Sequence, residues 1–338
     1  METVSSNLPA QIADAIVSIP KALTPGVVKA IDRLIAASVD IPVAWLHQKK
    51  AQIDAKTESY KLVETTVSTA AASLAGGDRE VVERAMNTLV RKEYRKQINR
   101  EATVAAMLSD LRDHPADVTS DDGASAPINE LDDDWLNVFE RYAEDASSER
   151  LQGLWGRVLA GEIRRPGRFS TRTLRFLSEF SQADAVLFEI FAQSAFGDCA
   201  PTKLVASEEV KDIRNLVNLE ASGLIQGSSG LGLTKSHKFD NNGAALIGEG
   251  CNFIILRGKP DTSISYEIVA LTPLGQEVIS LIGSRDARDA AKKMAFAIRS
   301  PEIQEAYLGV LPNLKGSSTF NIMEILWLQG TSSSQTVE

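Results

Sequence analysis

The chain has 338 residues, of which 43% are hydrophobic and 24% are charged, and its formal net charge is −9. A single hydrophobic core stops growing at about 250 to 300 residues, so we expect several folded modules. The apolar content excludes a wholly disordered chain. The negative charge argues against a nucleic-acid partner, because proteins that bind nucleic acids concentrate Lys and Arg against the phosphates.

The few cysteines suit a reducing compartment, and the lack of long apolar runs argues against a membrane-spanning helix. Cys199 and Cys251 are too few for a disulfide framework and lack metal-ligand spacing. We expect no secretory signal, and no stretch approaches the ~20 apolar residues of a membrane-spanning helix. We therefore expect a cytoplasmic protein, with peripheral attachment to the inner membrane as the alternative.

Residues 1–46 are predicted to form an amphipathic N-terminal segment of two short helices, whose ends are marked by prolines. One face of this segment collects apolar side chains, namely Ile12, Ile16, Ile31, Leu34 and Ile35. We expect this face to be buried against the rest of the protein or against a second copy. Contact with a membrane surface is the alternative, although Lys and Arg are balanced by Asp in this segment.

Residues 47–112 are predicted to form a long helical hairpin. From residue 44 to 74 there is no Pro or Gly, and apolar residues recur at every seventh position, at Leu46, Ile53, Tyr60, Val67 and Leu74. This spacing is typical of one coiled-coil seam. A Gly pair at 76–77 ends this arm, and a second arm follows over about 79–111. Each arm would be about 45 to 50 Å long, so we expect a homo-oligomer.

After a polar linker at 113–128, residues 129–182 are predicted to form an Arg-rich helical module. Its cationic side chains are candidates for binding an anion or a partner, because arginine suits bidentate contact with carboxylate or phosphate. We favour their internal pairing with the acidic helix at 130–145, and we expect Arg165 or Arg172 to hold Glu162. The candidate residues are Arg157, Arg164, Arg165, Arg168, Arg172 and Arg175.

Residues 183–285 are predicted to form a winged-helix-like α+β domain. A helix over 207–222 ends in LEASGLI, strand-like stretches lie at 252–256 and 265–270, and LTPLGQEVI begins a helix capped by Thr272. Acidic residues outnumber basic ones on the 207–222 helix, which disfavours DNA recognition. Residues 286–338 are predicted to form C-terminal helices and a disordered tail. The fold class of the whole chain is predicted to be mainly α.

Residues 148–182, SERLQGLWGRVLAGEIRRPGRFSTRTLRFLSEFSQ, resemble the signature of an uncharacterised bacterial family defined only as a domain of unknown function. We expect the resemblance to extend to about residue 282. It implies a bacterial protein with no established activity, and it supplies no catalytic residues. Proteins of this type also suggest a role in phage defence, which we keep as an alternative.

No catalytic or cofactor-binding pattern is recognised. The three histidines are far apart in sequence, and GSSGLGLTK at 227–235 departs from the phosphate-loop pattern. We therefore expect a protein without enzyme activity, cofactor or metal, which oligomerises through its long helices and docks an unidentified protein partner. The alternatives are a membrane-surface effector and a nucleic-acid-binding regulator.

Overall fold

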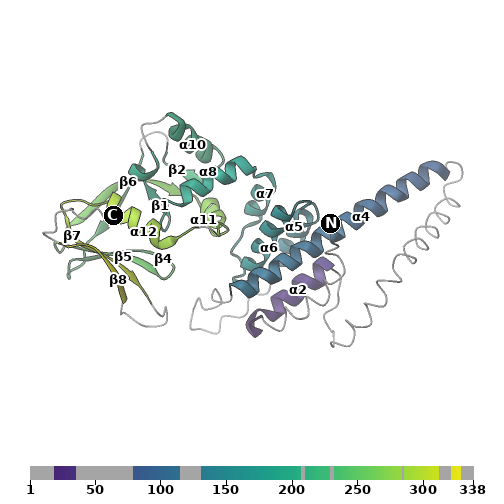
Figure 1. The fold of residues 1–338 in the computed structure, drawn as a ribbon, viewed down its shortest axis with the longest axis horizontal. Helices are drawn as coiled ribbons and strands as arrows, with labels where there is room; N and C mark the ends of the chain where they lie inside the picture. The colour runs from purple at the N-terminus through teal and green to yellow at the C-terminus, as the bar shows by residue number, and fades with distance from the viewer. Residues whose placement is uncertain are drawn as a thin grey trace, which may run out of the picture. The chain divides into compact units, whose positions relative to one another are not determined.

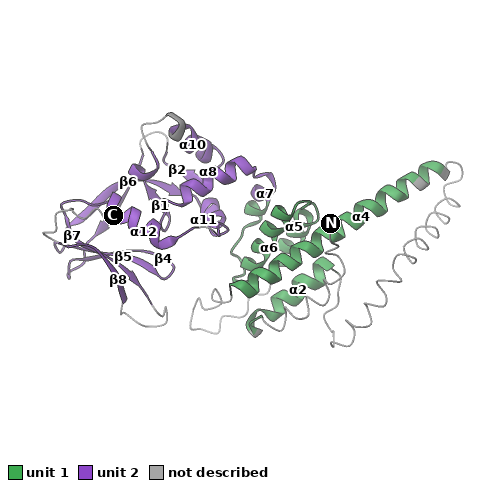
Figure 2. Ribbon diagram, viewed as in Figure 1, with its two compact units in different colours: residues 1–119, 125–174 green, residues 120–124, 175–338 purple. Residues whose placement is uncertain are grey.

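The computed structural model describes residues 19–35, 79–114, 131–206, 210–228, 232–283, 285–311 and 321–328. The fold is mixed α+β, with a long helix and two antiparallel sheets in the C-terminal half (Figure 1). The prediction of a mainly α fold with an α+β C-terminal domain is confirmed in part, because the C-terminal half contains two sheets. The chain divides into two compact units, one of residues 1–119 and 125–174 and one of residues 120–124 and 175–338 (Figure 2).

The first unit is helical and is built around one long helix. Its described helices are η2 (Lys21–Leu23), α2 (Thr24–Ile35), α4 (Arg79–Asp113), α5 (Asp133–Ala143) and α6 (Glu149–Arg164), with α7 (Thr171–Glu179) at the boundary. Helix α4 has 35 residues and packs against α2, α5 and α6 through its C-terminal half, where Val104, Met107 and Leu111 are fully buried. Its N-terminal half continues beyond these helices (Figure 1). The second arm of the predicted hairpin is thus a helix, while the first arm lies outside the described residues.

Capping residues fix where the short helices of this unit begin. The Asp132 carboxylate accepts a hydrogen bond from the Trp135 backbone N–H at 2.9 Å, and the Ser148 hydroxyl accepts one from the Leu151 N–H at 3.3 Å. These bonds satisfy amide groups that have no partner within a helix. The acidic start of α5 is therefore structural.

Helices α4 and α6 cross at short range because a glycine lies at their contact. A Cβ atom added to Gly156 would lie 2.5 Å from the Ala106 Cβ. The neighbouring Trp155 is buried and stacks on Tyr142, with ring centroids 5.5 Å apart. The tryptophan is thus an aromatic anchor beside a close helix crossing.

The second unit begins with helices around a small antiparallel sheet. Strands β1, β2 and β3 all pair with β6, in the order β1-β6-β2 with β3 also on β6. The Thr272 hydroxyl caps the following helix by accepting the Gly275 N–H at 3.0 Å, as predicted. The elements are α8 (Gln182–Ala192), β1 (Cys199–Pro201), α9 (Thr202–Val205), α10 (Val210–Ala221), β2 (Ile225–Gln226), β3 (Leu233–Lys238), β6 (Ser263–Leu271) and α11 (Pro273–Ile279).

A second antiparallel sheet has the order β4-β5-β7-β8, and helix α12 (Ala287–Ala297) packs on it. Its strands are β4 (Ala244–Glu249), β5 (Asn252–Gly258), β7 (Ile303–Val310) and β8 (Asn321–Trp327). The prediction of helices after residue 286 holds for α12 and is wrong for β7 and β8. Short apolar runs do not distinguish a buried strand from a helix, and both strands are of this kind.

The two sheets share one core with α12. Side chains from β5, β6, β7 and α12 meet there, among them Ile254, Ile268, Leu308 and Met294. Arg285, just before α12, holds the rim of this core by donating hydrogen bonds to the carbonyls of Ala192 and Ala195 and to the Glu249 carboxylate. The elements from α8 to β8 therefore fold together.

Several predicted features fall outside the described residues. These are the seam residues Leu46, Ile53, Tyr60, Val67 and Leu74, the N-terminal Ile12 and Ile16, nearly all of the linker at 113–128, and the tail after 328. Among the helices of the described part, none combines the length and the apolar character needed to cross a membrane.

Candidate partner-binding face on the long helix

The predicted Arg cluster does not form one surface. The Arg164 side chain is buried, and its guanidinium lies 2.7 Å from the Asp110 carboxylate on α4. The predicted pairing of the cluster with the acidic helix is therefore wrong for Arg164. The acidic side chains of α5 and its C-terminal cap are bound instead by cations of α2 and α4, in the pairs Arg33–Glu140, Arg100–Glu140 and Lys96–Glu144.

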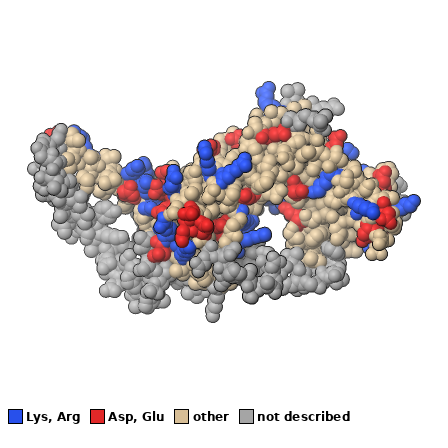
Figure 3. All heavy atoms as spheres, turned by 180° about the vertical axis from the view of Figure 1, so that it is seen from behind, with Lys and Arg blue, Asp and Glu red and all other residues tan. Residues whose placement is uncertain are grey.

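The other arginines of the cluster are at the surface or partly covered. Arg157, Arg165 and Arg172 are exposed, Arg175 pairs with Glu179 at 3.4 Å, and Arg168 lies over the Phe169 ring at 5.6 Å. On the face drawn in Figure 3, basic and acidic side chains are interspersed rather than separated into a single basic surface. The described residues on this face therefore show no separate basic surface.

Glu162, inside the same segment, has a structural role. This buried carboxylate accepts hydrogen bonds from the backbone N–H groups of Gly167 at 2.5 Å and Phe169 at 2.9 Å. It thereby ties the turn after α6 back to the helix, and Trp135 donates its indole N–H to the Phe169 carbonyl at 2.7 Å. The turn holds α5 and α6 together.

The candidate membrane or partner face of the N-terminal segment belongs to the core where it is described. Ile31 and Leu34 are each 2% exposed, and Ile35 is half-buried. Lys29 holds α2 in place by donating to the Leu131 carbonyl at 2.6 Å and pairing with Asp133 at 3.0 Å. This arrangement agrees with the preferred expectation of burial for the described members of the face.

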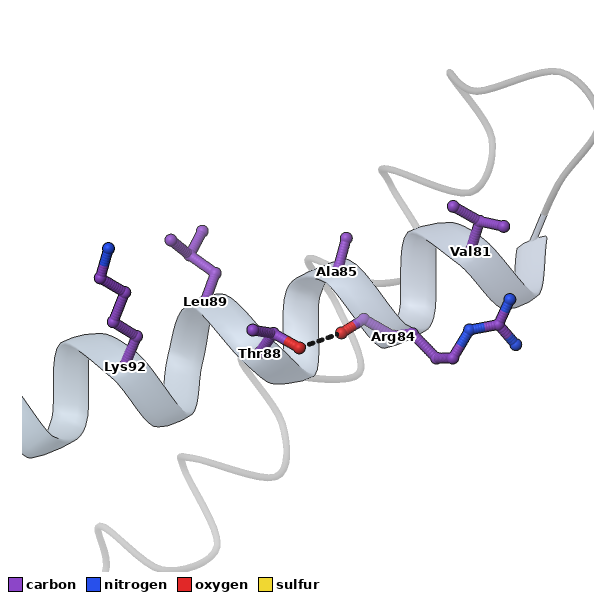
Figure 4. A pocket seen from close by; sticks show the side chains of 6 residues that line it. All are labelled: Val81, Arg84, Ala85, Thr88, Leu89 and Lys92. Carbon is purple, nitrogen blue, oxygen red and sulfur yellow. Dashed lines mark hydrogen bonds between the residues drawn. The ribbon is translucent and has the colours of Figure 1, made fainter.

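The exposed half of α4 carries an apolar row that the sequence interpretation did not single out. Val81, Ala85 and Leu89 lie one turn apart on one side of the helix and line a shallow pocket (Figure 4). Val81 is 48% exposed and Leu89 is 51% exposed. Residues four apart share a helix face, so this spacing was visible in the sequence. The sequence did not show which face of the helix stays uncovered.

Charged side chains flank this row, which we call the α4 row. Arg84 forms an exposed ion pair with Glu80 at 3.4 Å at its N-terminal end. Lys92 lies at its C-terminal end and makes no ion pair with another described residue (Figure 4). Arg91 and Arg95 are also exposed next to it. The row is thus apolar in the middle, with the Glu80–Arg84 ion pair at one end and the basic Lys92 at the other.

Elsewhere in the described residues, several titratable side chains lie close together around Lys235. Lys235 bonds to Asp198 and lies 3.9 Å from the Cys199 Sγ, and the His237 ring stacks on Tyr266 with its Nε2 3.0 Å from the tyrosine hydroxyl. Burial raises the pKa of the Cys199 thiol to about 12 and, with the nearby Lys235 charge, lowers the pKa of His237. Both groups are therefore neutral at neutral pH, and within the described chain no His, Cys, Asp and Glu side chains cluster as metal ligands.

Comparisons with known proteins give one match. Residues 83–231 match the model of a family described as protein of unknown function (DUF2806), and this match includes the segment 148–182 but ends well before residue 282. Neither the curated proteins nor the solved structures contain a match to the chain. The match covers most of α4, the helices from α5 to α10, and strands β1 and β2. The chain thus carries a DUF2806 domain, a domain of unknown function, at residues 83–231.

Proposed function

We propose that this chain is a non-enzymatic interaction protein that oligomerises by docking the α4 row against the same row of a second copy. The observation that carries the proposal is the row itself. Val81 and Leu89 expose about half of their surface on a helix that continues beyond its own bundle. Contact between these apolar side chains and water is unfavourable, and a helix of a second copy packed against them removes that contact.

Charge along α4 favours an antiparallel pair. The row is symmetric about Ala85, so antiparallel docking places Val81 of one copy beside Leu89 of the other. Glu80 of each copy then lies near Lys92 of the other copy, so this charged contact forms twice. Parallel docking would instead place like charges together, which is unfavourable at close range. A second copy therefore fits both the apolar and the charged parts of the row.

The described row alone supports only a weak contact. Covering an exposed aliphatic side chain contributes about 1.5 to 3 kcal/mol if it is fully buried, and Val81 and Leu89 are already half covered. Association also costs several kcal/mol of rigid-body entropy. The predicted seam at Leu46, Ile53, Tyr60, Val67 and Leu74 would lengthen the interface, and we include it in the proposal.

The mass of the full chain in solution tests this proposal. Sedimentation or light scattering should give an oligomer for the natural chain and a smaller species for Leu89→Asp. Ile98→Asp is the matched control, because Ile98 is 43% exposed on the same helix, nine residues or about half a turn's rotation away from Leu89. A monomeric natural chain, or equal masses for the natural chain and Leu89→Asp, would contradict the proposal.

For the second unit we propose a winged-helix module with an inserted hairpin. The order of elements supports it, since α8, β1, α9 and α10 are followed by strands that pair as β1-β6-β2, with β4 and β5 lying in sequence between β3 and β6. Helix α10 would be the recognition helix, but it exposes Ile213 and Val217. These side chains suit a protein contact better than a DNA groove. A salt-dependent shift of labelled DNA is the observation that would reverse this preference.

A membrane-surface role is the remaining alternative, and it would need α2 to leave its bundle. Val27, Ile31 and Leu34 are buried there, and losing such contacts costs about 1.5 to 3 kcal/mol for each fully buried side chain. Liposome flotation of the full chain, compared with a Lys29→Met variant that lacks the Lys29 contacts to Leu131 and Asp133, measures whether this happens. Flotation of the natural chain would favour the membrane role over docking.

A further inference from the structure

The second unit ends in an exposed strand at the edge of a sheet. Strand β8 is the last strand in the order β4-β5-β7-β8, so no strand of the described chain pairs with its outer edge. Edge strands present unpaired N–H and C=O groups to any other strand that can reach them. Whatever covers this edge must therefore supply a backbone in the extended conformation.

The side chains of this strand are unusually apolar for an exposed edge. Ile322, Met323 and Ile325 are 57%, 54% and 56% exposed. The strand contains no Lys, Arg or Pro, which are the residues that commonly protect an edge. Its one charged residue, Glu324, is already paired with Lys292 of α12 at 2.6 Å. The edge is thus apolar and carries no unpaired charge.

The apolar character continues across the face of the sheet opposite α12, where Leu246 and Ile325 are exposed and Ile255 is buried. The strand registers align Leu246, Ile255, Tyr307 and Ile325 in one row across all four strands. Ile255 packs over Gly309, where an added Cβ would lie 2.8 Å from its Cδ1. The row ends at the exposed Ile325, so a fifth strand beside β8 would extend it.

We propose that β8 pairs antiparallel with β8 of a second copy, joining two sheets into one. An occupant must be extended, apolar and without unpaired charge, and β8 itself meets all three conditions. Pairing two copies about a two-fold axis satisfies both edges at once and joins the two apolar rows. The two register shifts between β7 and β8 increase the local twist, which limits how long this ladder becomes.

The β8 interface is separate from the α4 row. A chain that uses both contacts would assemble into a larger oligomer. Each chain would carry two self-complementary contacts, one on each unit. Such a chain links to two neighbours, so it forms a closed even-numbered ring or an extended row of copies rather than a single dimer. The proposal therefore adds a higher-order assembly to the docking proposed for α4.

The test uses the full chain carrying Leu89→Asp, so that association through α4 is absent. Hydrogen exchange of a peptide covering residues 321–328 is measured at low and at high protein concentration. We expect exchange to slow at high concentration, and Ile325→Lys to abolish that dependence. The matched control Leu246→Lys lies in the same row on the opposite edge strand, where the side chain is 43% exposed, and should leave the dependence unchanged.

Three results would overturn the proposal. The first is exchange at 321–328 that is independent of concentration in the Leu89→Asp chain. The second is loss of the dependence with both Lys variants, which would indicate β4-to-β8 contacts. The third is a concentration dependence that persists in both Ile325→Lys and Met323→Lys. Two variants are used because one of them could refold locally. Unchanged exchange in β5 peptides shows that each variant is folded. Failure of the α4 proposal is read separately, from equal masses of the natural and Leu89→Asp chains.

Discussion

Arg164 binds Asp110 at two points, pairing with its carboxylate at 2.7 Å and donating a hydrogen bond to its backbone carbonyl at 2.7 Å. The two residues are 54 positions apart in sequence and join α6 to α4. Only 5% of the arginine side chain and 13% of the aspartate side chain are exposed. The pair therefore fastens the C-terminal half of α4, which in turn positions the exposed half that carries the α4 row.

Removing the Arg164 side-chain charge should destabilise the helical unit strongly. In Arg164→Met, the Asp110 carboxylate stays buried without its partner, which costs about 3 to 5 kcal/mol. The control Arg175→Met removes an exposed pair with Glu179 and should cost less than about 0.5 kcal/mol. Urea unfolding followed by tryptophan emission, to which Trp135 and Trp155 contribute, measures both. Equal losses would contradict the role given to the buried pair.

Two glycines of α6 should respond to alanine in opposite directions. Gly156→Ala places a Cβ 2.5 Å from the Ala106 Cβ, and such overpacking costs about 1 to 3 kcal/mol. Around Gly153 an added Cβ meets nothing within 4 Å, so Gly153→Ala should stabilise the helix by up to about 1 kcal/mol. The same unfolding measurement applies. A stabilised Gly156→Ala would mean that α4 and α6 are farther apart than described.

Arg285 should control the order of the turn between α8 and β1. Its guanidinium donates to the Ala192 carbonyl at 3.0 Å and to the Ala195 carbonyl at 2.6 Å, besides binding Glu249. Arg285→Met should therefore speed hydrogen exchange at residues 193–199. Lys238→Met, which removes an exposed pair with Asp261, should leave it unchanged. Slow exchange in both variants would show that the turn is held by other contacts.

The two cysteines should differ in reactivity. Burial raises the pKa of the Cys199 thiol to about 12, so it stays protonated, while Cys251 is exposed. A thiol reagent at neutral pH should modify one cysteine per folded chain and two after unfolding. Reaction of both cysteines in the folded chain would contradict the burial of Cys199.

The same shift predicts a pH dependence. Between the ordinary thiol pKa of 9.0 and about 12, the unfolded chain ionises Cys199 while the folded chain keeps its proton. The free energy of unfolding should therefore decrease as the pH rises through this range. Cys199→Ser removes this contribution and should give a shallower decrease in alkaline urea titrations.

Local signals in the sequence predicted much of the helical part. The caps Asp132, Ser148 and Thr272 act within three residues of themselves, so their pattern is readable without the fold. Strands β7 and β8 were missed because short apolar runs are ambiguous. In addition, β7 pairs with β5, which lies about 50 residues earlier in the sequence, and β8 then pairs with β7.

The candidate site was less predictable, because it depends on which surfaces are left over after packing. Met107 and Leu111 continue the same apolar spacing along α4 as Ala85 and Leu89, yet the first two are buried and Leu89 is half exposed. Periodicity gives a face, and the position of α6 decides which part of that face is covered. Likewise Arg164 was visible as a cation, but its partner Asp110 lies on a different helix.

Disulfide formation at the centre of the α4 row tests the self-docking of α4 most directly. In a full chain carrying Cys251→Ser, an antiparallel pair brings Ala85→Cys of two copies face to face. We predict that mild oxidation yields a covalent dimer for Ala85→Cys and none for Ile98→Cys, which lies on the other side of the helix. A covalent dimer through Ile98→Cys but not Ala85→Cys, or no dimer with either, would contradict the account.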